Sequence, residues 1–365
     1  MKAVILCAKK KEDMFPFSET RPTALMPIMG RPLVWHLIDS LENNGIDEIY
    51  LVTNYKEEQF EQQFEEYTNV NLIHQEDLNG TANAVEECNF IEEDLIIING
   101  DVVVSSNDLK NLINKHRNEE QEITLLATNN NKPEKFGVLS IKDDKIESIV
   151  EKPENPENTL VNSGIYATSP KIFEEIGENN DSSLTEVVKS FAKKRSAKFE
   201  LIQDHWIDIG SPEKLWKADK IKREHLITET EISDEAEVHE NVEIKGKAIV
   251  RPGAVLEPGT VLEDNVFVGE GSKIGPNSVV RDSSINKECL VRNSTVERSV
   301  LFEDNSLDPY VFVESSILGE DCSVKSCTTV RESFIGGRSF IETNNSIRGV
   351  KFVPDARTDL SEISK

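Results

Sequence analysis

The sequence lacks any long apolar run: none of its stretches approaches the roughly 20 apolar residues that a membrane-spanning helix needs. Its start also lacks the succession of charged, apolar and small residues that marks a signal peptide. Both absences argue against a membrane or secreted protein, so we expect a cytoplasmic one. The length of 365 residues suffices for two domains with separate hydrophobic cores.

Cysteine and positive charge are scarce. The 5 cysteines are odd in number and lack the paired spacing of zinc ligands, so reduced thiols are the default expectation. The chain has 41 Lys and Arg against 67 Asp and Glu, which gives a formal net charge of -26. This charge would repel nucleic acids and anionic membranes, and it argues against both as partners.

Short apolar runs alternate with amphipathic segments in the first part of the chain. Residues 1–8 (MKAVILCA) are typical of a buried parallel strand, residues 35–45 of an amphipathic helix that ends at a glycine, and residues 46–52 of the next strand. Such alternation predicts an α/β fold with a doubly wound, mainly parallel sheet and ligands at the carboxyl ends of its strands. We expect this Rossmann-like domain to span residues 1–228.

A strict six-residue spacing of aliphatic residues marks the rest of the chain. It includes Val238, Ile244, Val250, Leu256, Leu262, Val268, Ile274 and Val280. Such a hexapeptide repeat is the signature of a left-handed parallel β-helix, in which each hexad forms one face of a triangular coil. The register slips near Ser284 and returns later, at Val324, Val330, Ile341, Ile347 and Val353. We expect this second domain over residues 229–365.

Several motifs of the first domain follow one another in the order of a known family. They are KKKEDMFP from Lys9, RPTALMP from Arg21, QEDLNGTA from Gln75, an apolar strand ending at Asp101, FGV from Phe136, VEKP from Val150, VNSGIY from Val161 and WIDIGSP from Trp206. This succession resembles the sugar-1-phosphate nucleotidylyltransferases (NDP-sugar pyrophosphorylases) as far as about residue 228. The resemblance implies that a nucleoside triphosphate and a sugar 1-phosphate are joined with release of pyrophosphate.

The loop after the first strand departs most from this family. Lys9 and Lys11 stand where the family has glycines, Asp13 where it has an arginine, and Thr23 where it has a lysine. In the family these glycines bring backbone N–H groups to the triphosphate, and the basic residues neutralise its charge. Lys9, Lys10 and Lys11 could still attract a triphosphate as point charges, or they could form an ordinary solvated turn.

The resemblance also implies a nucleotide site and a metal site. Gln75, Gly80 and Thr81 match a pyrimidine-reading segment, which favours UTP or dTTP: an amide offers a donor and an acceptor to a base edge, and glycine lets a flat ring approach. Asp101 and Asp208 match carboxylates that hold Mg²⁺, a hard cation that takes oxygen ligands. The alternative for the segment from Gln75 to Thr81 is an ordinary loop before a helix. For Asp101 it is an Asn-Gly turn, and for Asp208 a Ser-Pro helix cap.

A sugar site is implied at Gly137, Glu151, Lys152 and Asn162. A carboxylate accepts hydrogen bonds from paired hydroxyls, an amide both donates and accepts, and a lysine can meet the sugar phosphate. Taken alone, the Glu-Lys-Pro segment would be a surface turn.

Three functions are compatible with these observations. The first is the nucleotidylyltransferase, with Mg²⁺ as cofactor and a β-helix that assembles a homo-oligomer. The second is a regulatory subunit that keeps the pockets, turns over poorly and binds a catalytic paralogue. The third is a bifunctional enzyme with an acetyltransferase in the β-helix. We disfavour it because acyl transfer usually needs a histidine base, and no histidine follows His239.

Overall fold

The computed structural model describes residues 1–119, 121–179 and 183–358, and the chain divides into two compact units. The first unit contains Met1–Lys10 and Leu33–Asp208, and the second contains Lys11–Pro32 and Ile209–Lys365. Each unit has a hydrophobic core of its own. The second unit therefore combines the C-terminal repeats with a short segment from near the start of the chain.

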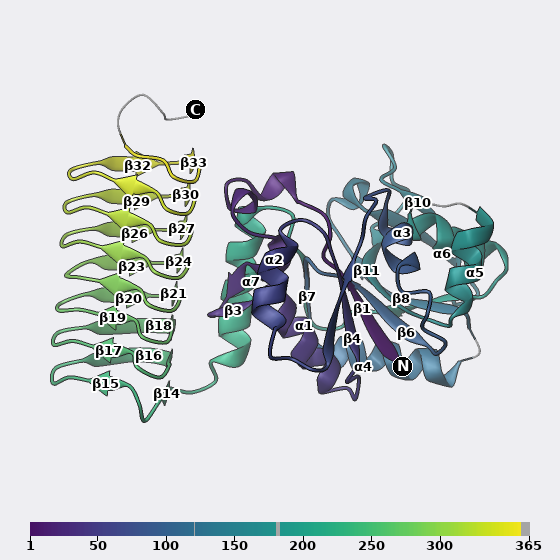
Figure 1. Ribbon diagram of the computed structural model, residues 1–365, viewed down its shortest axis with the longest axis horizontal. Coiled ribbons are helices and arrows are strands. Elements are labelled where there is room, and N and C mark those ends of the chain that lie inside the picture. Colours follow the sequence, from purple (N-terminus) through teal and green to yellow (C-terminus); the bar gives the residue numbers. More distant parts are fainter. Residues whose placement is uncertain (120, 180–182, 359–365) are drawn as a thin grey trace. The chain divides into compact units, whose positions relative to one another are not determined.

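A nine-stranded sheet forms the centre of the first unit, with the path β10-β9-β11-β6-β1-β4-β5 and with β8 and β12 off this path (Figure 1). Its neighbouring parallel strands are β1 (Lys2–Leu6), β4 (Ile49–Thr53), β5 (Val70–His74) and β6 (Leu95–Asn99). Because β1 lies between β4 and β6, the strand order reverses there. The carboxyl ends of β1 and β6 are where such a sheet places its ligands.

Antiparallel pairing makes this sheet mixed rather than mainly parallel. The further strands are β8 (Ile123–Asn129), β9 (Gly137–Lys142), β10 (Lys145–Glu151), β11 (Leu160–Thr168) and β12 (Ala197–Leu201). β11 runs antiparallel to β6, β8 and β9, whereas β12 runs parallel to β8. A separate antiparallel ladder joins β7 (Val102–Val104) to β13 (Trp206–Asp208). The predicted Rossmann-like α/β fold is confirmed, with a larger antiparallel share than expected.

Helices follow the strands of the first unit as the alternation predicts. They are α1 (Leu33–Glu42), α2 (Glu57–Phe64), α3 (Thr81–Glu86), α4 (Ser106–Asn118), α5 (Lys171–Asn179) and α6 (Leu184–Lys193), with the 3-10 helix η4 (Pro133–Lys135). The caps of α4 and α6 are serines: Ser105 Oγ accepts from Asp108 N at 3.0 Å, and Ser183 Oγ accepts from Thr185 N at 3.1 Å. Such caps satisfy N–H groups that a helix start leaves unpaired.

The second unit begins with an irregular segment. Residues 11–32 form the 3-10 helices η1 (Glu12–Met14), η2 (Phe17–Glu19) and η3 (Thr23–Leu25) and the short strands β2 (Pro27–Ile28) and β3 (Arg31–Pro32). The chain returns to this unit in helix α7 (Pro212–Leu226), which leads into the repeats.

Short parallel strands wind into stacked coils in the rest of the second unit (Figure 1). One side consists of β15 (Glu237–Val238), β17 (Val255–Leu256), β19 (Lys273–Ile274), β22 (Leu290–Val291), β25 (Ser306–Leu307), β28 (Ser323–Val324) and β31 (Phe340–Ile341). A second side consists of β20 (Val279–Arg281), β23 (Thr295–Glu297), β26 (Phe312–Glu314), β29 (Thr329–Arg331) and β32 (Ser346–Arg348). The third has β14 (Glu231–Ile232), β21 (Ser284–Ile285), β24 (Val300–Leu301), β27 (Ile317–Leu318), β30 (Phe334–Ile335) and β33 (Lys351–Phe352). The longer strands β16 (Glu243–Val250) and β18 (Val261–Val268) continue from the second side into the third. This is the predicted β-helix.

The coil length explains the register slip. Val261 pairs with Val279 eighteen residues later, as three hexads require, but Val279 pairs with Thr295 only sixteen residues later. The following coils keep seventeen residues, as in the pairing of Thr295 with Phe312. The expected core position at Val353 is therefore wrong: Val353 is 38% exposed, and Phe352, at 4%, points into the core instead.

A ladder of buried serines supports the shortened coils. It consists of Ser283, Ser299, Ser316 and Ser333, each at a corner before a strand of the third side. Each hydroxyl donates to a carbonyl oxygen two residues earlier. Those of Ser283, Ser299 and Ser316 accept the backbone N–H of the next member of the ladder at 3.0 to 3.1 Å, and that of Ser333 accepts from Val350 N at 3.3 Å. Buried polar groups are tolerated when they are hydrogen-bonded in this way.

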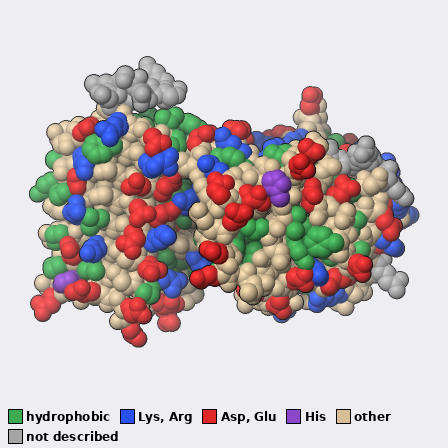
Figure 2. Space-filling model, in the orientation of Figure 1, with side chains coloured by type: hydrophobic (Ala, Val, Ile, Leu, Met, Phe, Trp, Pro, Cys, Tyr) green, Lys and Arg blue, Asp and Glu red, His purple; other side chains and the backbone are tan. Residues whose placement is uncertain are grey.

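Acidic side chains are spread over the visible surface of both units, with basic ones among them, as Figure 2 shows. This distribution agrees with the net charge of -26. In the part of the chain that the structure describes, no helix has the length and apolar character to cross a membrane.

Candidate active site

Asp101 lies where the strand order of the sheet reverses. It follows β6, and the N–H of Gly100 donates to the carbonyl oxygen of Leu6 at the end of β1, at 2.9 Å. A Cβ on Gly100 would lie 2.5 Å from Cys7 Sγ and 2.9 Å from Leu6 O, so this turn requires glycine. Asp101 itself is only 7% exposed. Burial, together with the negative charge of Asp101, raises the pKa of the Cys7 thiol.

Asp208 reaches the same region through the ladder of β7 and β13. It stands opposite Val102, which directly follows Asp101. The two predicted metal ligands, far apart in sequence, therefore occupy neighbouring positions in the fold. Their common role stays a prediction.

The predicted sugar residue Asn162 lies in an irregular part of β11, where the register with β8 shifts between Asn162 and Tyr166. Its Oδ1 accepts from Gly164 N at 3.0 Å, and its Nδ2 donates to the Tyr166 hydroxyl at 2.7 Å. Burial raises the pKa of Tyr166 to about 12, so the phenol stays protonated at neutral pH. The amide keeps one further acceptor lone pair and one further N–H for a ligand.

Gly164 brings this irregular segment against the end of β6. Its φ is +78°, and a Cβ there would lie 2.3 Å from Asn99 Nδ2. Trp206 makes a second tie, because its Nε1 donates to Ser163 O at 3.0 Å and its ring packs on Phe136 with 5.5 Å between centroids. Trp206 starts the strand that carries Asp208. The predicted sugar and metal residues are thus held in one region.

The start of α6 links two more predicted residues. Leu184 N donates to Thr81 Oγ1 at 3.0 Å, and Thr185 Oγ1 donates to Glu151 Oε2 at 2.8 Å. Thr81 belongs to the predicted nucleotide segment and Glu151 to the predicted sugar site. One helix start therefore contacts both.

Gly137 and Lys152 flank Glu151. Gly137 pairs with Glu151 across β9 and β10, and a Cβ on Gly137 would lie 3.2 Å from Glu151 Oε2. Lys152 Nζ lies 3.9 Å from Glu151 Oε1, and both side chains are exposed. An exposed ion pair at this distance contributes little to stability, so both groups can exchange it for a ligand.

Gln75 and Gly80 form the two ends of a loop after β5. Gln75 is 3% exposed, and its Nε2 donates to Asp77 O at 2.9 Å within this loop. Gly80 has a φ of +145° and caps α3, a conformation that favours glycine. The amide nitrogen of Gln75 thus contributes to the conformation of this loop.

The three lysines of the altered phosphate loop are divided between the units. Lys9 and Lys10 end the first stretch of the first unit, and Lys10 Nζ lies 5.8 Å from the centre of the Tyr55 ring. Lys11 opens the second unit, ahead of an exposed Asp13. Thr23, which replaces the family's lysine, is buried at 5% exposure. Whether the lysines bind phosphate stays a prediction.

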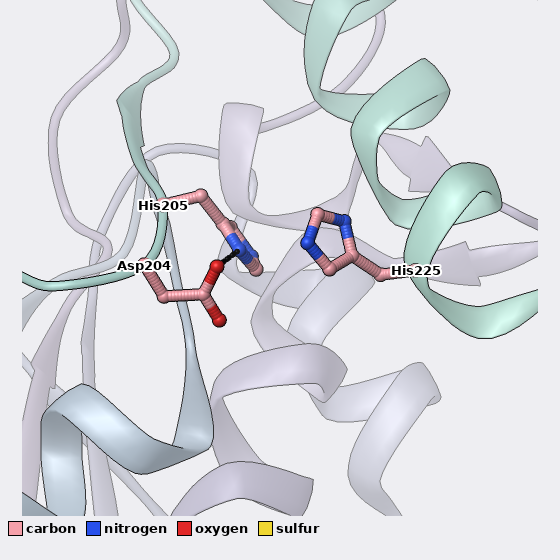
Figure 3. A group of neighbouring side chains, drawn as sticks. All are labelled: Asp204, His205 and His225. Atoms are coloured by element: carbon pink, nitrogen blue, oxygen red, sulfur yellow. Dashed lines mark ion pairs between the residues drawn. The ribbon is translucent and has the colours of Figure 1, made fainter.

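Several supporting residues escaped the sequence analysis. Asp108, 1% exposed, accepts the backbone N–H groups of Gln203 at 2.8 Å and Asp204 at 3.3 Å, which fixes the chain before β13. Figure 3 shows Asp204 paired with His205, with Oδ1 and Nδ1 3.2 Å apart. His225, also labelled there, belongs to α7 and its Nδ1 lies 2.8 Å from Ile221 O. The hydrogen bonds that Asp108 and His225 make to backbone groups leave no periodic pattern in the sequence. The only sequence signal near Asp204 and His205 is the WIDIGSP motif that follows them.

Residues 2–225 match the family model described as nucleotidyl transferase. The chain belongs to this family. Residues 238–347 match the model described as the GMPPB C-terminal domain. This chain is 32% identical to the Bifunctional protein GlmU of Methanocaldococcus jannaschii, over 90% of this chain and 80% of that protein. The UTP--glucose-1-phosphate uridylyltransferase AglF of Haloferax volcanii is 28% identical over 63% of this chain and 100% of that protein.

A solved structure supports the fold. The crystal structure of a protein from Bacillus anthracis, assigned as a glucose-1-phosphate thymidylyltransferase, superposes with a TM-score of 0.57 over 60% of this chain and 94% of that one, at 24% identity. At this identity the likeness concerns the fold alone. Members of this family are transferases that act on nucleoside triphosphates and sugar phosphates, and they typically use a divalent metal ion.

Proposed function

We propose that the protein joins a pyrimidine nucleoside triphosphate, UTP or dTTP, to a sugar 1-phosphate and releases pyrophosphate. The observation that carries this proposal is the pairing of β7 with β13, which sets Asp208 opposite the residue after Asp101. Gly164, which approaches Asn99, adds the predicted sugar segment to the same region. The name of the Haloferax volcanii relative supports a uridine nucleotide.

In this reaction an oxygen of the sugar 1-phosphate attacks the α-phosphorus, and the bond from that phosphorus to the bridging oxygen of pyrophosphate breaks. The protein's task is to position the reactants and neutralise charge. Glu151 and Asn162 would orient sugar hydroxyls, Lys152 would meet the sugar phosphate, and Gln75 and Gly80 would hold the base.

Asp101 and Asp208 fit a divalent cation by the chemistry of their donors, because both offer carboxylate oxygens of the kind that Mg²⁺ prefers. The close packing of Gly100 against Leu6 and Cys7 fixes the backbone that carries Asp101. We propose Mg²⁺ as this ion; bound there, it would neutralise charge on the phosphates.

The β-helix is assigned no chemistry of its own. The name of the Methanocaldococcus jannaschii relative indicates two activities. In this chain no histidine follows His239, and the run from Leu307 to Val311 has Tyr310 after Pro309 where an acetyltransferase of this type would carry histidine. We propose instead that the β-helix assembles a homo-oligomer. A cytoplasmic location remains a prediction of the sequence.

The test is an assay of purified protein with Mg²⁺, each nucleoside triphosphate and a panel of sugar 1-phosphates, measuring pyrophosphate release and ligand-induced thermal stabilisation. We expect release with UTP or dTTP, and its loss in Asp101→Asn and Asp208→Asn. Asp143→Asn is the control, since Asp143 forms an exposed pair with Arg195. Stabilisation by a nucleotide without pyrophosphate from any pair would favour the regulatory subunit.

A further inference from the structure

The third side of the β-helix presents an unusually apolar outer surface, which we call the covered face. From β16 to β30, the last residue of each strand on this side points into the core, so the residue before it points outward. These outward residues are Ile249, Phe267, Ser284, Val300, Ile317 and Phe334, and all but Phe334 are at most 4% exposed. The burial is explained in part by residues 11–32, which belong to the same unit and which we call the anchor segment.

The first part of the anchor segment is held by Phe17 and Arg21. The Phe17 ring, 1% exposed, lies 5.3 Å from the ring of Phe302 and 6.4 Å from that of Phe334. Arg21 forms an ion pair with Glu303 and lies 4.0 Å from Glu320. Burial alone would raise the pKa of Glu303, but the guanidinium of Arg21 outweighs this effect and holds that pKa below its usual range.

The second part is held by a buried polar network. Met29 N donates to Asp219 Oδ1 at 3.0 Å, and Asp219 also accepts from Ser284 Oγ and from Arg223 Nε at 2.9 Å. Asp219 and Arg223 are both 0% exposed. Gly30 lies so close to Phe267 that a Cβ would come within 2.7 Å of its ring. Both parts of the anchor segment are therefore fixed to the β-helix or to α7.

Arg21 is a basic residue in the motif that follows the phosphate loop, and it could have compensated for the arginine replaced by Asp13. The structure instead pairs it with two carboxylates of the β-helix. A guanidinium already neutralised in this way has little charge left for a phosphate. The anchor segment follows Lys10 directly along the chain, so its fixation restrains the end of the altered phosphate loop.

Building on the proposed function, we infer that the β-helix positions the phosphate loop, with Arg21 as a positioning residue fixed by Glu303. Ordering this loop in advance removes part of the conformational entropy that nucleotide binding would otherwise cost. Loss of the Arg21–Glu303 pair should therefore weaken binding of the nucleoside triphosphate more than binding of the sugar 1-phosphate.

The test uses the full chain with Arg21→Met, Glu303→Gln and the conservative Arg21→Lys. Glu297→Gln is the matched control, because Glu297 has a similar side-chain exposure (15% against 16%) and pairs with Arg281 and Arg298 of the β-helix itself. Hydrogen exchange of the amides of residues 11–32 reports on anchoring without reference to activity. The KM values for nucleoside triphosphate and for sugar 1-phosphate report on positioning.

We expect exchange in the anchor segment to rise about 10-fold or more in Arg21→Met and Glu303→Gln, less in Arg21→Lys and not in Glu297→Gln. The KM for the nucleoside triphosphate should rise in the same order, while that for the sugar 1-phosphate stays within about twofold. The inference would be overturned if Arg21→Met and Glu303→Gln left both the exchange of residues 11–32 and the KM for the nucleoside triphosphate unchanged. Increased exchange spread over all coils of the β-helix would overturn it as well. A wild-type protein without pyrophosphate release would refute the proposed function instead, and the exchange result would still decide whether the segment is anchored.

Discussion

Replacing Gly164 with alanine tests whether the irregular part of β11 positions the end of β6. The φ of +78° costs a residue with a side chain about 1 to 2 kcal/mol. The new Cβ would also meet Asn99 Nδ2 at 2.3 Å, well inside contact distance, so Asn99 has to move. Asn99 lies two residues before Asp101, and a displacement of about 1 Å in an active site can lower the rate about 100-fold.

Gly45→Ala provides a matched control in the same unit. Gly45 has a φ of +75°, and a Cβ there would meet no atom within 4 Å. Urea denaturation should show a loss of about 1 kcal/mol or more in both variants, larger in Gly164→Ala. Pyrophosphate release should fall at least about 10-fold in Gly164→Ala alone. Equal stability and equal activity of the two variants would refute the proposed role of the Gly164 contact.

Four further predictions concern stability and reactivity. Ser316→Ala should lower the free energy of unfolding by about 1 to 3 kcal/mol in urea denaturation, because it leaves the buried N–H of Ser333 without its acceptor; an unchanged midpoint would contradict the serine ladder. Asp219→Asn should cost about 1 to 3 kcal/mol by calorimetry, because Arg223 loses its fully buried partner and keeps the ion pair with Asp282; an unchanged free energy of unfolding would contradict the role of this network. Because folding lowers the pKa of Glu303, its ionised form stabilises the protein above the usual carboxyl pKa range, and this contribution disappears as the pH falls through the lowered pKa. Glu303→Gln should therefore flatten the acid side of a curve of unfolding free energy against pH. A curve identical to that of the wild type would contradict the stabilising role of the Arg21–Glu303 pair. A thiol reagent should modify Cys327 alone in the native protein, because the other cysteines are buried; rapid labelling of a second cysteine, identified by mass spectrometry, would contradict the core packing.

Periodicity predicted the two kinds of fold because it reports burial directly. Apolar runs marked β1, β4 and β6, and the six-residue spacing marked the early coils of the β-helix. The spacing failed at Val353 because the coils shorten from eighteen to sixteen and seventeen residues. The predicted division of the sequence at residue 228 stays a prediction.

The anchor segment could not be predicted, because the residues that hold it are separated by most of the chain. Arg21 and Glu303 lie 282 positions apart, and neither stands out by spacing or composition. The hydrogen bonds of Trp206 and Thr185 could not be predicted for a related reason: Trp206 donates to a backbone carbonyl and Thr185 to an exposed carboxylate, contacts that a sequence pattern does not encode. Motif order, by contrast, indicated Asp101 and Asp208, which the ladder of β7 and β13 brings to neighbouring positions.

Pyrophosphate release by Asp101→Asn, Asp208→Asn and the double variant, compared with wild type, tests most directly whether the two carboxylates hold one metal ion together. If they act as a unit, each single variant should lose nearly as much activity as the double variant. Losses that multiply in the double variant, or wild-type turnover by either single variant, would contradict a shared metal site.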